Sequence, residues 1–320
     1  MKILVTGGAG FIGSHVVDGY IREGHDVVVV DNLFTGKLEN LNPRAKFYLA
    51  DVRDQIIERV FEIERPDIVN HHAAQMSVPD SVKNPKFDAD VNVMGILNLL
   101  ENSVRYGVKK FIFISTGGAV YGEADTIPTT EDTLPRPLSP YAISKFTSEN
   151  YLRYYQAQYG LKYTILRYAN IYGPRQVPHA EAGVVSIFMS SLSKGQLPTL
   201  YHYPDEPDGM TRDYCFVYDV VRANILALDK AENEILNIGT SVETTTGKLY
   251  RTILEQMRRH GFCKESRFDS PKRGPARAGD LRRSALSYEK AKNLLGWKPE
   301  YDLERGISET LKREVIEKQR

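Results

Sequence analysis

The sequence has 320 residues, 42% of them hydrophobic and 26% charged, and a formal net charge of +1. This length is enough for a large core and two lobes, and the composition is ordinary for a globular protein. The near-neutral charge argues against nucleic acid or an anionic membrane surface as a partner. No stretch could span a membrane, and the apolar start at residues 1–5 is too short for a targeting segment. We therefore expect a cytoplasmic protein without membrane or nucleic-acid partners.

The cysteines and paired histidines do not predict a metal site. Cys215 and Cys263 are too few for a disulfide framework or a thiolate cluster. His71 and His72 are neighbours in an expected strand, so their side chains point to opposite faces. We expect two free thiols in a reducing compartment and no metal.

The first motif is an apolar run at residues 3–6 that leads into spaced glycines and then a helical pattern. The run predicts a buried parallel strand. Glycines at this spacing permit a tight turn and a close approach of the backbone to a pyrophosphate at a helix N-terminus. The turn therefore predicts a dinucleotide site formed by Gly7, Gly10, Phe11, Ile12 and Gly13.

A second apolar run, residues 27–30, ends at Asp31 and Asn32. Asp31 has the place of the carboxylate that accepts hydrogen bonds from the adenosine ribose, and it would repel a 2′-phosphate. NAD is therefore favoured over NADP. The alternative is that both residues only form a turn after the strand.

Four more runs predict strands at residues 47–50, 67–70, 110–116 and 163–167, and helical segments separate several of them. Such alternation predicts a Rossmann-type, doubly wound parallel sheet with the cofactor across the carboxyl ends of its strands. Residues near these ends are expected to contact the cofactor: Asp51, Val52, Ala73, Ala74 and Gln75. Asn92, in a helix expected at about 86–106, either faces the core or lies near the cofactor.

The segment around residue 140 predicts a helix that carries a catalytic pair. Ser139 suits an N-cap and Pro140 suits the first helical position. Tyr141 and Lys145 then lie one turn apart on one face. A neighbouring ammonium favours the phenolate, so we expect Tyr141 to be a base with a lowered pKa. Alternatively, the pair meets at this spacing by accident.

The rhythm of strands and helices changes after residue 173, where prolines become frequent. We expect a smaller C-terminal lobe for the substrate, with a return to the sheet at residues 234–239. The expected domains are residues 1–173 plus about 213–240 for NAD, and residues 174–212 plus about 241–320 for the substrate.

The order of the glycine turn, Asp31, the strand end at Thr116 and the Tyr141–Lys145 pair resembles the extended short-chain dehydrogenase/reductase family. Further motifs at 167–170, 182–185, 208–214 and 277–281 are similar to those of nucleotide-sugar epimerases of the UDP-glucose (UDP-galactose) 4-epimerase type. The resemblance implies NAD as cofactor and a UDP-sugar as substrate, which passes through a 4-keto intermediate. It also implies that Tyr141 takes the proton of the sugar 4-hydroxyl and that Lys145 holds the nicotinamide ribose.

The same resemblance implies a set of residues near the nucleotide and the sugar: Gly117, Asn170, Val184, Tyr201, Arg212, Arg277, Asp280 and Ser284. Arginine suits a diphosphate because it forms bidentate, charge-assisted bonds. For each arginine alone, a surface salt bridge is the alternative. Ser284 matches a position that borders the hexose, and its small side chain leaves room for an N-acetyl group; alternatively it lies on an uninvolved loop.

One position departs from the family pattern. Members usually have Ser or Thr where this chain has Gly117, and that hydroxyl contacts the sugar. Thr116 is adjacent, but in an extended strand its side chain would face the other way. Either the Gly117–Gly118 bend turns Thr116 into the site, or Tyr141 contacts the sugar directly or through water.

Other functions remain as alternatives. One is an epimerase of another specificity, such as UDP-glucuronate. Another is a 4,6-dehydratase or decarboxylase of the same family, although the acid that these enzymes need near the Tyr121 motif is replaced by Ala119. The most distant is a non-catalytic NAD-binding sensor. By resemblance, helices near 86–106 and 140–159 would form the interface of a homodimer.

Overall fold

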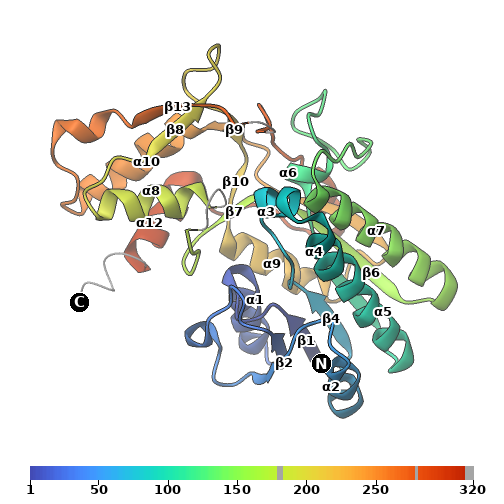
Figure 1. The fold of residues 1–320 in the computed structure, drawn as a ribbon. Coiled ribbons are helices and arrows are strands. Elements are labelled where there is room, and N and C mark those ends of the chain that lie inside the picture. Colours follow the sequence, from blue (N-terminus) through green and yellow to red (C-terminus); the bar gives the residue numbers. More distant parts are fainter. Residues whose placement is uncertain (179–182, 278–279, 314–320) are drawn as a thin grey trace.

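The chain forms a sheet flanked by helices, with a smaller lobe beside it (Figure 1). This computed structural model describes residues 1–178, 183–277 and 280–313. Its strands are β1 (Lys2–Thr6), β2 (Asp26–Asp31), β3 (Lys46–Leu49), β4 (Ile68–His71), β5 (Lys110–Thr116), β6 (Lys162–Tyr168), β7 (Asn170–Tyr172), β8 (Thr199–His202), β9 (Thr211–Arg212), β10 (Tyr214–Phe216), β11 (Glu234–Ile238), β12 (Thr244–Thr245) and β13 (Lys272–Pro275).

Helices alternate with most of these strands. They are α1 (Phe11–Arg22), α2 (Ile56–Glu64), α3 (Val78–Lys83), α4 (Pro85–Ala89), α5 (Gly95–Arg105), α6 (Gly117–Val120), α7 (Pro140–Tyr159), α8 (Val184–Ser193), α9 (Val217–Ala227), α10 (Thr246–Arg259), α11 (Glu289–Leu295) and α12 (Leu303–Leu311). Short 3-10 turns are Leu38–Asn40 and Ser266–Asp269, and a π turn at Asp90–Met94 connects α4 to α5.

The central sheet has seven parallel strands in the order β11-β6-β5-β4-β1-β2-β3. The winding direction reverses between β1 and β4. In doubly wound sheets, ligands bind at this reversal, at the carboxyl ends of the strands. The predicted fold class is confirmed, including the return of β11 to the sheet.

Side chains alternate along each strand, so the sheet has two separate cores. Ile3 and Val5 of β1 belong to a cluster with residues of α1, α9 and α11, whereas Leu4 belongs to a cluster with residues of α2, α5 and α7. Helices therefore cover both faces, and the apolar runs read in the sequence are strands buried on both sides.

The smaller lobe has its own core, to which α8, α10 and α12 contribute Phe188, Leu249 and Ile307. Three two-stranded pairs, β7–β10, β8–β13 and β9–β12, complete it and join it to the sheet. The division at residues 173, 213 and 240 into a cofactor domain and a substrate lobe stays a prediction.

Candidate functional site

A cavity of about 1210 Å³ extends over the carboxyl ends of the strands and against the smaller lobe. Most of the residues predicted for the site line it. These are Gly7, Gly10, Phe11, Ile12, Gly13, Asp31, Asn32, Asp51, Val52, Ala73, Ala74, Gln75, Thr116, Tyr141, Lys145, Asn170, Val184, Tyr201, Arg212, Arg277 and Asp280. Among the predicted residues, all of which the structure describes, Asn92, Gly117 and Ser284 lie outside this wall.

The glycine turn between β1 and α1 forms one end of the cavity. Gly7 has φ +70°, and a Cβ added there would lie 2.6 Å from the backbone nitrogen of Ala73. A Cβ on Gly13 would lie 2.2 Å from the carbonyl oxygen of Gly7. Only glycine fits either position. Gly10, the N-cap residue of α1, has no side chain that could cap the first backbone N–H groups of the helix. The helix N-terminus therefore opens into the cavity as a cradle for a pyrophosphate.

Asp31 ends β2 beside this cradle. Its carboxylate accepts hydrogen bonds from the backbone nitrogens of Ala9, at 3.0 Å, and Leu33, at 2.8 Å. Burial raises the pKa of Asp31, and these two hydrogen bonds oppose the rise. The carboxylate is thus held by the backbone at the cavity wall, where a ribose diol fits and a 2′-phosphate would be repelled.

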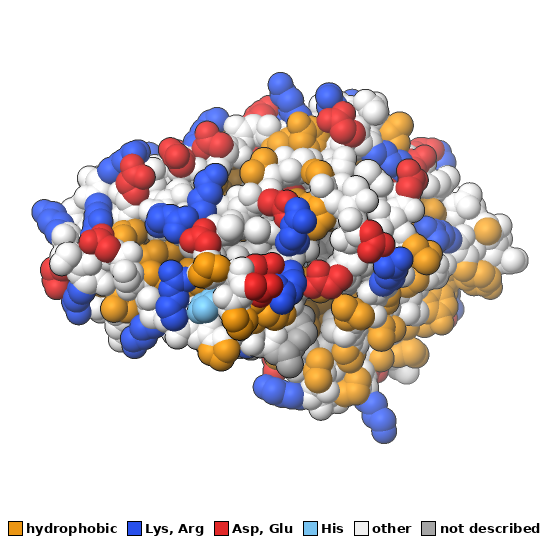
Figure 2. Space-filling model, turned by 90° about the horizontal axis from the view of Figure 1, so that it is seen from above, with side chains coloured by type: hydrophobic (Ala, Val, Ile, Leu, Met, Phe, Trp, Pro, Cys, Tyr) orange, Lys and Arg blue, Asp and Glu red, His pale blue; other side chains and the backbone are white. Residues whose placement is uncertain are grey.

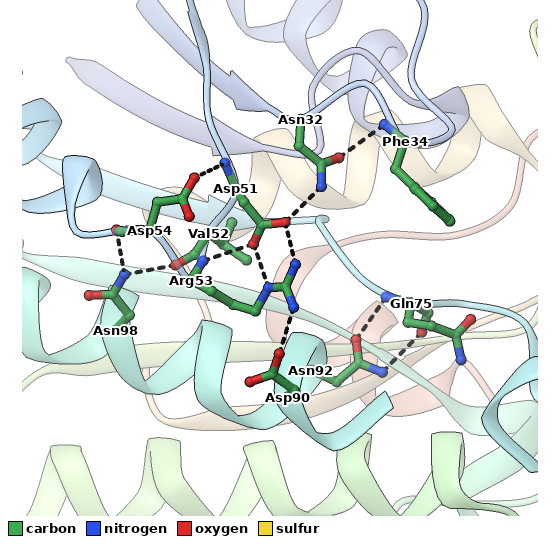
Figure 3. A network of polar contacts seen from close by, with 10 residues as sticks. All are labelled: Asn32, Phe34, Asp51, Val52, Arg53, Asp54, Gln75, Asp90, Asn92 and Asn98. Carbon is green, nitrogen blue, oxygen red and sulfur yellow. Dashed lines mark hydrogen bonds and ion pairs between the residues drawn. The ribbon is translucent and has the colours of Figure 1, made fainter. Parts of the chain in front are cut away.

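Asp51 is fixed by an arginine that the sequence motifs did not single out. Arg53 binds both carboxylate oxygens of Asp51, at 2.8 and 2.9 Å, and also Asp90 of the π turn (Figure 3). Asn32 donates to the same carboxylate at 2.8 Å. The Arg53 hydrogen bonds are the main cause that lowers the pKa of Asp51 to about 2. This network links β3 to the helical segment that packs on α7, and Arg53 itself lines the cavity.

Asn92 acts on the cavity wall through Gln75. Its side chain is buried; its oxygen accepts from the Gln75 backbone nitrogen at 3.0 Å, and its amide donates to the Gln75 carbonyl at 2.9 Å (Figure 3). The same amide donates to Asp88 and to Ser144 of α7. Of the two alternatives for Asn92, the structure favours the core-facing one, in which its side chain holds Gln75 against α7.

The helix α7 begins as predicted. The hydroxyl of Ser139 accepts from the backbone nitrogen of Ala142 at 3.2 Å, and Pro140 takes the first position. Tyr141 and Lys145 both reach the cavity. The Lys145 ammonium donates to the carbonyl oxygen of Ile114 at 2.9 Å, and burial lowers its pKa to about 8.

The pKa of Tyr141 shifts in the direction opposite to the expected one. Burial, followed by the charge of Asp88, raises its pKa above the ordinary value. The predicted lowering by Lys145 is therefore wrong for the chain by itself. The desolvation cost of a buried phenolate exceeds what one neighbouring ammonium returns.

Thr116, and not Gly117, forms the cavity wall at the end of β5. Thr116 has extended backbone, with φ −134° and ψ 113°, and α6 starts at the next residue. Gly117 is buried, and a Cβ there would lie 2.4 Å from a methyl carbon of Leu286. Leu286 fills the space beside Gly117, and Thr116 lines the cavity, which favours the alternative in which Thr116 reaches the site. The substrate role of Gly117 stays a prediction.

The smaller lobe supplies the other end of the cavity. The Arg212 guanidinium donates to the carbonyl oxygens of Thr211 and Leu281, both at 2.8 Å. Arg277 lies over the ring of Tyr201, 4.6 Å from its centroid, and its backbone nitrogen donates to Asp280 at 3.0 Å. Two cationic side chains and an aromatic ring here suit a nucleotide diphosphate and its base.

Ser284 does not line this wall. A Cβ on Gly118 would be 3.8 Å from the Ser284 hydroxyl and 3.7 Å from the amide oxygen of Asn170. Ser284 therefore lies near Gly118 and near Asn170, which does line the cavity. Ala182, Ala278 and Gly279 of the quoted motifs lie outside the described residues.

Several wall residues were missed in the sequence. Apart from Arg53, they include Phe34, Lys37, Arg175 and Gln176. Their contacts with the site depend on loops and on segments distant in sequence. For Arg53, the only signal in the sequence is the nearby Asp51. For Arg175 and Gln176, it is the run Gly173–Arg175 that follows β7.

The described residues contain no cluster of His, Cys, Asp or Glu that could hold a metal ion. In the same residues, no helix is long and apolar enough to cross a membrane. Both described cysteines, Cys215 and Cys263, are free thiols.

Comparisons with known proteins agree with this geometry. The chain is 50% identical to a UDP-glucose 4-epimerase of Thermotoga maritima solved with UDP-glucose, with a TM-score of 0.93 over 100% of this chain and 99% of that one. It is 45% identical to a Thermus thermophilus UDP-glucose 4-epimerase solved with NAD, with a TM-score of 0.90 over 98% of both chains. It is 32% identical to a UDP-N-acetylglucosamine 4-epimerase of Methanobrevibacter ruminantium, with a TM-score of 0.90 over 99% and 98%. Residues 3–239 match the NAD-dependent epimerase/dehydratase family, and the chain belongs to this family.

Proposed function

We infer that the chain is an NAD-dependent UDP-glucose 4-epimerase, which interconverts UDP-glucose and UDP-galactose. One observation carries this conclusion: a single cavity joins the pyrophosphate cradle of α1, the Tyr141–Lys145 pair of α7 and the arginines of the smaller lobe. A cofactor and a sugar nucleotide fit end to end in such a cavity. The similarity over the whole chain to 4-epimerases supports the same activity.

The residues that would hold NAD follow from the wall. The α1 N-terminus binds the pyrophosphate, Asp31 the adenosine ribose, and Lys145 the nicotinamide ribose. When bound, NAD would supply reversible hydride transfer, so that the sugar C4 could be oxidised and then reduced on its opposite face. The chain must therefore keep both the cofactor and the oxidised sugar in place between these events.

The chain's own residues move the proton. Tyr141 takes the proton from the sugar 4-hydroxyl and later returns it. Because burial raises the Tyr141 pKa, the phenolate depends on positive charge brought close to it when the site is loaded. Thr116, at the wall beside this pair, provides a hydroxyl that can relay the proton or orient the sugar.

An assay of the purified protein over UDP-sugars tests the function. We expect UDP-galactose to be converted to UDP-glucose, and the reverse, without loss of water or carbon dioxide from the sugar. A 4-keto-6-deoxy product would instead indicate a dehydratase, and turnover of UDP-glucuronate alone an epimerase of that specificity. Binding of NAD with no change in any sugar would indicate a sensor.

The sugar pocket is broad enough, we propose, for UDP-N-acetylhexosamines as well. Ser284, near Gly118 and Asn170, has a small side chain where a bulky one would restrict the sugar. The Ser284 hydroxyl and the Asn170 amide can also bind the amide of an N-acetyl group. The similarity to a UDP-N-acetylglucosamine 4-epimerase supports this extension.

Ser284→Tyr tests this extension. A phenol ring at this position would clash with the larger sugar, so we expect N-acetylhexosamine turnover to fall at least tenfold more than UDP-galactose turnover. Ser270→Tyr, at an exposed position, is the control. Equal losses on both substrate pairs, or no N-acetyl activity in the native protein, would contradict the proposal.

A homodimer is the assembly that we expect, through the helices near 86–106 and 140–159. Hydrophobic side chains gather at the right of the molecule in Figure 2, the side on which α5 and α7 lie in Figure 1. Met94 of the π turn and Tyr154 of α7 are each about half exposed. The free cysteines and the need for NAD support the expectation of a cytoplasmic protein.

Light scattering tests this assembly. We expect the mass of a dimer for the native chain, and monomers for Met94→Glu combined with Tyr154→Arg. Ile63 of α2 is a similarly exposed apolar residue away from these helices, and Ile63→Glu should leave the dimer intact. A monomeric native chain would contradict the proposal.

A further inference from the structure

Arg175 reaches the cofactor end of the cavity from far along the sequence. Its guanidinium lies 3.1 Å from the hydroxyl of Ser14 and 2.9 Å from the carboxylate of Asp18, both on α1. Ser14 belongs to the first turn of this helix, where its hydroxyl donates to the carbonyl of Phe11 at 3.1 Å. Arg175 also lines the cavity together with Phe11, Ile12 and Gly13. A positive charge from outside the glycine motif is therefore fixed beside the pyrophosphate cradle.

A second contact holds the same segment on α1. The Nε2 nitrogen of His15 lies 2.9 Å from the carbonyl oxygen of Pro174, and because a carbonyl only accepts, Nε2 is the donor. His15 is buried, and burial lowers its pKa to about 4, so it is neutral at physiological pH. The position of Arg175 is thus set by two independent contacts with α1, and it does not depend on the arginine side chain alone.

The charge around the cradle favours an anion. The first turn of α1 contains no acidic residue, and its N-cap Gly10 offers no side-chain acceptor. The partial positive charge of the helix N-terminus and the Arg175 guanidinium therefore lie at the same end of the cavity. Asp18 offsets part of the arginine charge, but it sits one turn further along α1, away from the cradle.

The segment also leads back to the substrate side. It follows β7 directly, and β7 begins with Asn170, which lines the cavity and is expected to contact the substrate. One short stretch thus connects the pyrophosphate cradle to the substrate wall.

We propose that Arg175 is a cofactor-binding residue that retains NAD through the pyrophosphate. It acts from a segment outside the nucleotide-binding motif and closes the cavity over the first turn of α1. This inference depends on NAD as the cofactor, but not on the identity of the sugar.

Release of NAD from the purified holoenzyme tests the proposal. Bound NAD is chased with an excess of isotopically labelled NAD, and the exchange rate is measured at increasing salt for the native chain, Arg175→Ala, Arg175→Gln and Arg175→Lys. We expect the alanine and glutamine variants to release NAD at least tenfold faster, and lysine to restore part of the difference because it keeps the charge. Salt should accelerate release from the native chain more than from the alanine variant.

Asp18→Asn separates a charge effect from simple packing. It removes the ion pair on α1 but leaves the arginine charge, so we expect NAD release to stay at the native rate or slow down. A release as fast as in Arg175→Ala would show that only the contact with α1 matters and would overturn the proposal. Native release rates in Arg175→Ala and Arg175→Gln would overturn it as well.

Two further readouts distinguish other failures. The melting temperature of each variant reports on folding, and glutamine keeps a donor for Ser14 if alanine destabilises the chain. If the native protein binds no NAD, both the assignment of NAD as the cofactor and the proposed role of Arg175 are contradicted. A failure only in the UDP-galactose assay would leave the role of Arg175 standing.

Discussion

At the scale of single residues, the site depends on Tyr141, whose charged phenolate form is disfavoured by burial. Burial and the charge of Asp88 both raise the pKa of Tyr141. The chain alone therefore does not yield a ready base. This arrangement limits proton transfer to the state in which further positive charge lies near the phenol.

Tyr141→Phe should abolish turnover without loss of the fold or of bound NAD. The phenylalanine ring keeps the packing but cannot accept the proton, and loss of a general base costs about two to four orders of magnitude in rate. Turnover of UDP-galactose, the melting temperature and bound NAD are measured together. A rate close to native would contradict the role of Tyr141.

Thr116→Ala should slow turnover by a factor of about ten or more, which corresponds to about 1.4 kcal/mol of transition-state stabilisation. We expect this slower turnover because Thr116 lines the same cavity as Tyr141 and Lys145. Thr130→Ala, at an exposed position, is the matched control. If the Thr116 variant keeps the native rate, Tyr141 works without this hydroxyl.

Gly117→Ser should destabilise the protein. Its Cβ would meet Leu286, whose backbone nitrogen is tied to the Asp213 carboxylate at 3.1 Å. Overpacking of this kind costs about 1 to 3 kcal/mol. Denaturant unfolding should show this loss, and Leu286→Ala should be less destabilising in the Gly117→Ser variant than in the native chain. Additive effects would contradict the contact.

At the scale of elements, helix α1 is held by a histidine that is neutral in the folded chain. Burial lowers the pKa of His15 to about 4, whereas an unfolded histidine has its ordinary pKa of about 6.5. The unfolded chain then binds more protons between these values, so stability must fall as the pH drops from about 6.5 towards 4.

His15→Gln should therefore flatten the stability profile in this range. Glutamine can still donate to Pro174 but does not titrate. At pH 5, the native chain should have lost about 2 kcal/mol through His15, and the variant should lack this loss. Urea unfolding at pH 7 and pH 5 measures the difference, with His260→Gln at an exposed position as the control. Parallel profiles for native and variant would exclude the effect.

The elements also show what the sequence could predict. The strands, the glycine turn and the start of α7 follow from local signals: apolar runs, glycine spacing and the Ser139–Pro140 cap. The π turn at Asp90–Met94 has no such signal, and it interrupts the helix expected there. It places Asp90 opposite Arg53 and Asn92 opposite Gln75 (Figure 3).

Contacts between distant segments could not be predicted. Arg175 meets Ser14 across 161 residues of sequence, and Leu286 packs beside position 117 from a segment far along the chain. The direction of the Tyr141 pKa depends on burial, which spacing along a helix does not reveal. Motifs therefore identified the chemistry, whereas the assembled fold determined which neighbours modify it.

At the scale of the whole molecule, the catalytic end of the sheet and the smaller lobe enclose one cavity. Cofactor and sugar must both stay inside it while C4 is oxidised and reduced again. A retained cofactor returns the same hydride to the sugar that gave it. This property separates the proposed reaction from proton abstraction at carbon, which exchanges hydrogen with water.

The most direct test uses UDP-galactose that carries deuterium at C4, incubated with the purified protein without added NAD. If the hydride is retained in the site, the UDP-glucose formed carries the deuterium at C4 and none appears in the solvent. Product in which C4 carries hydrogen from water would contradict this retention of the hydride.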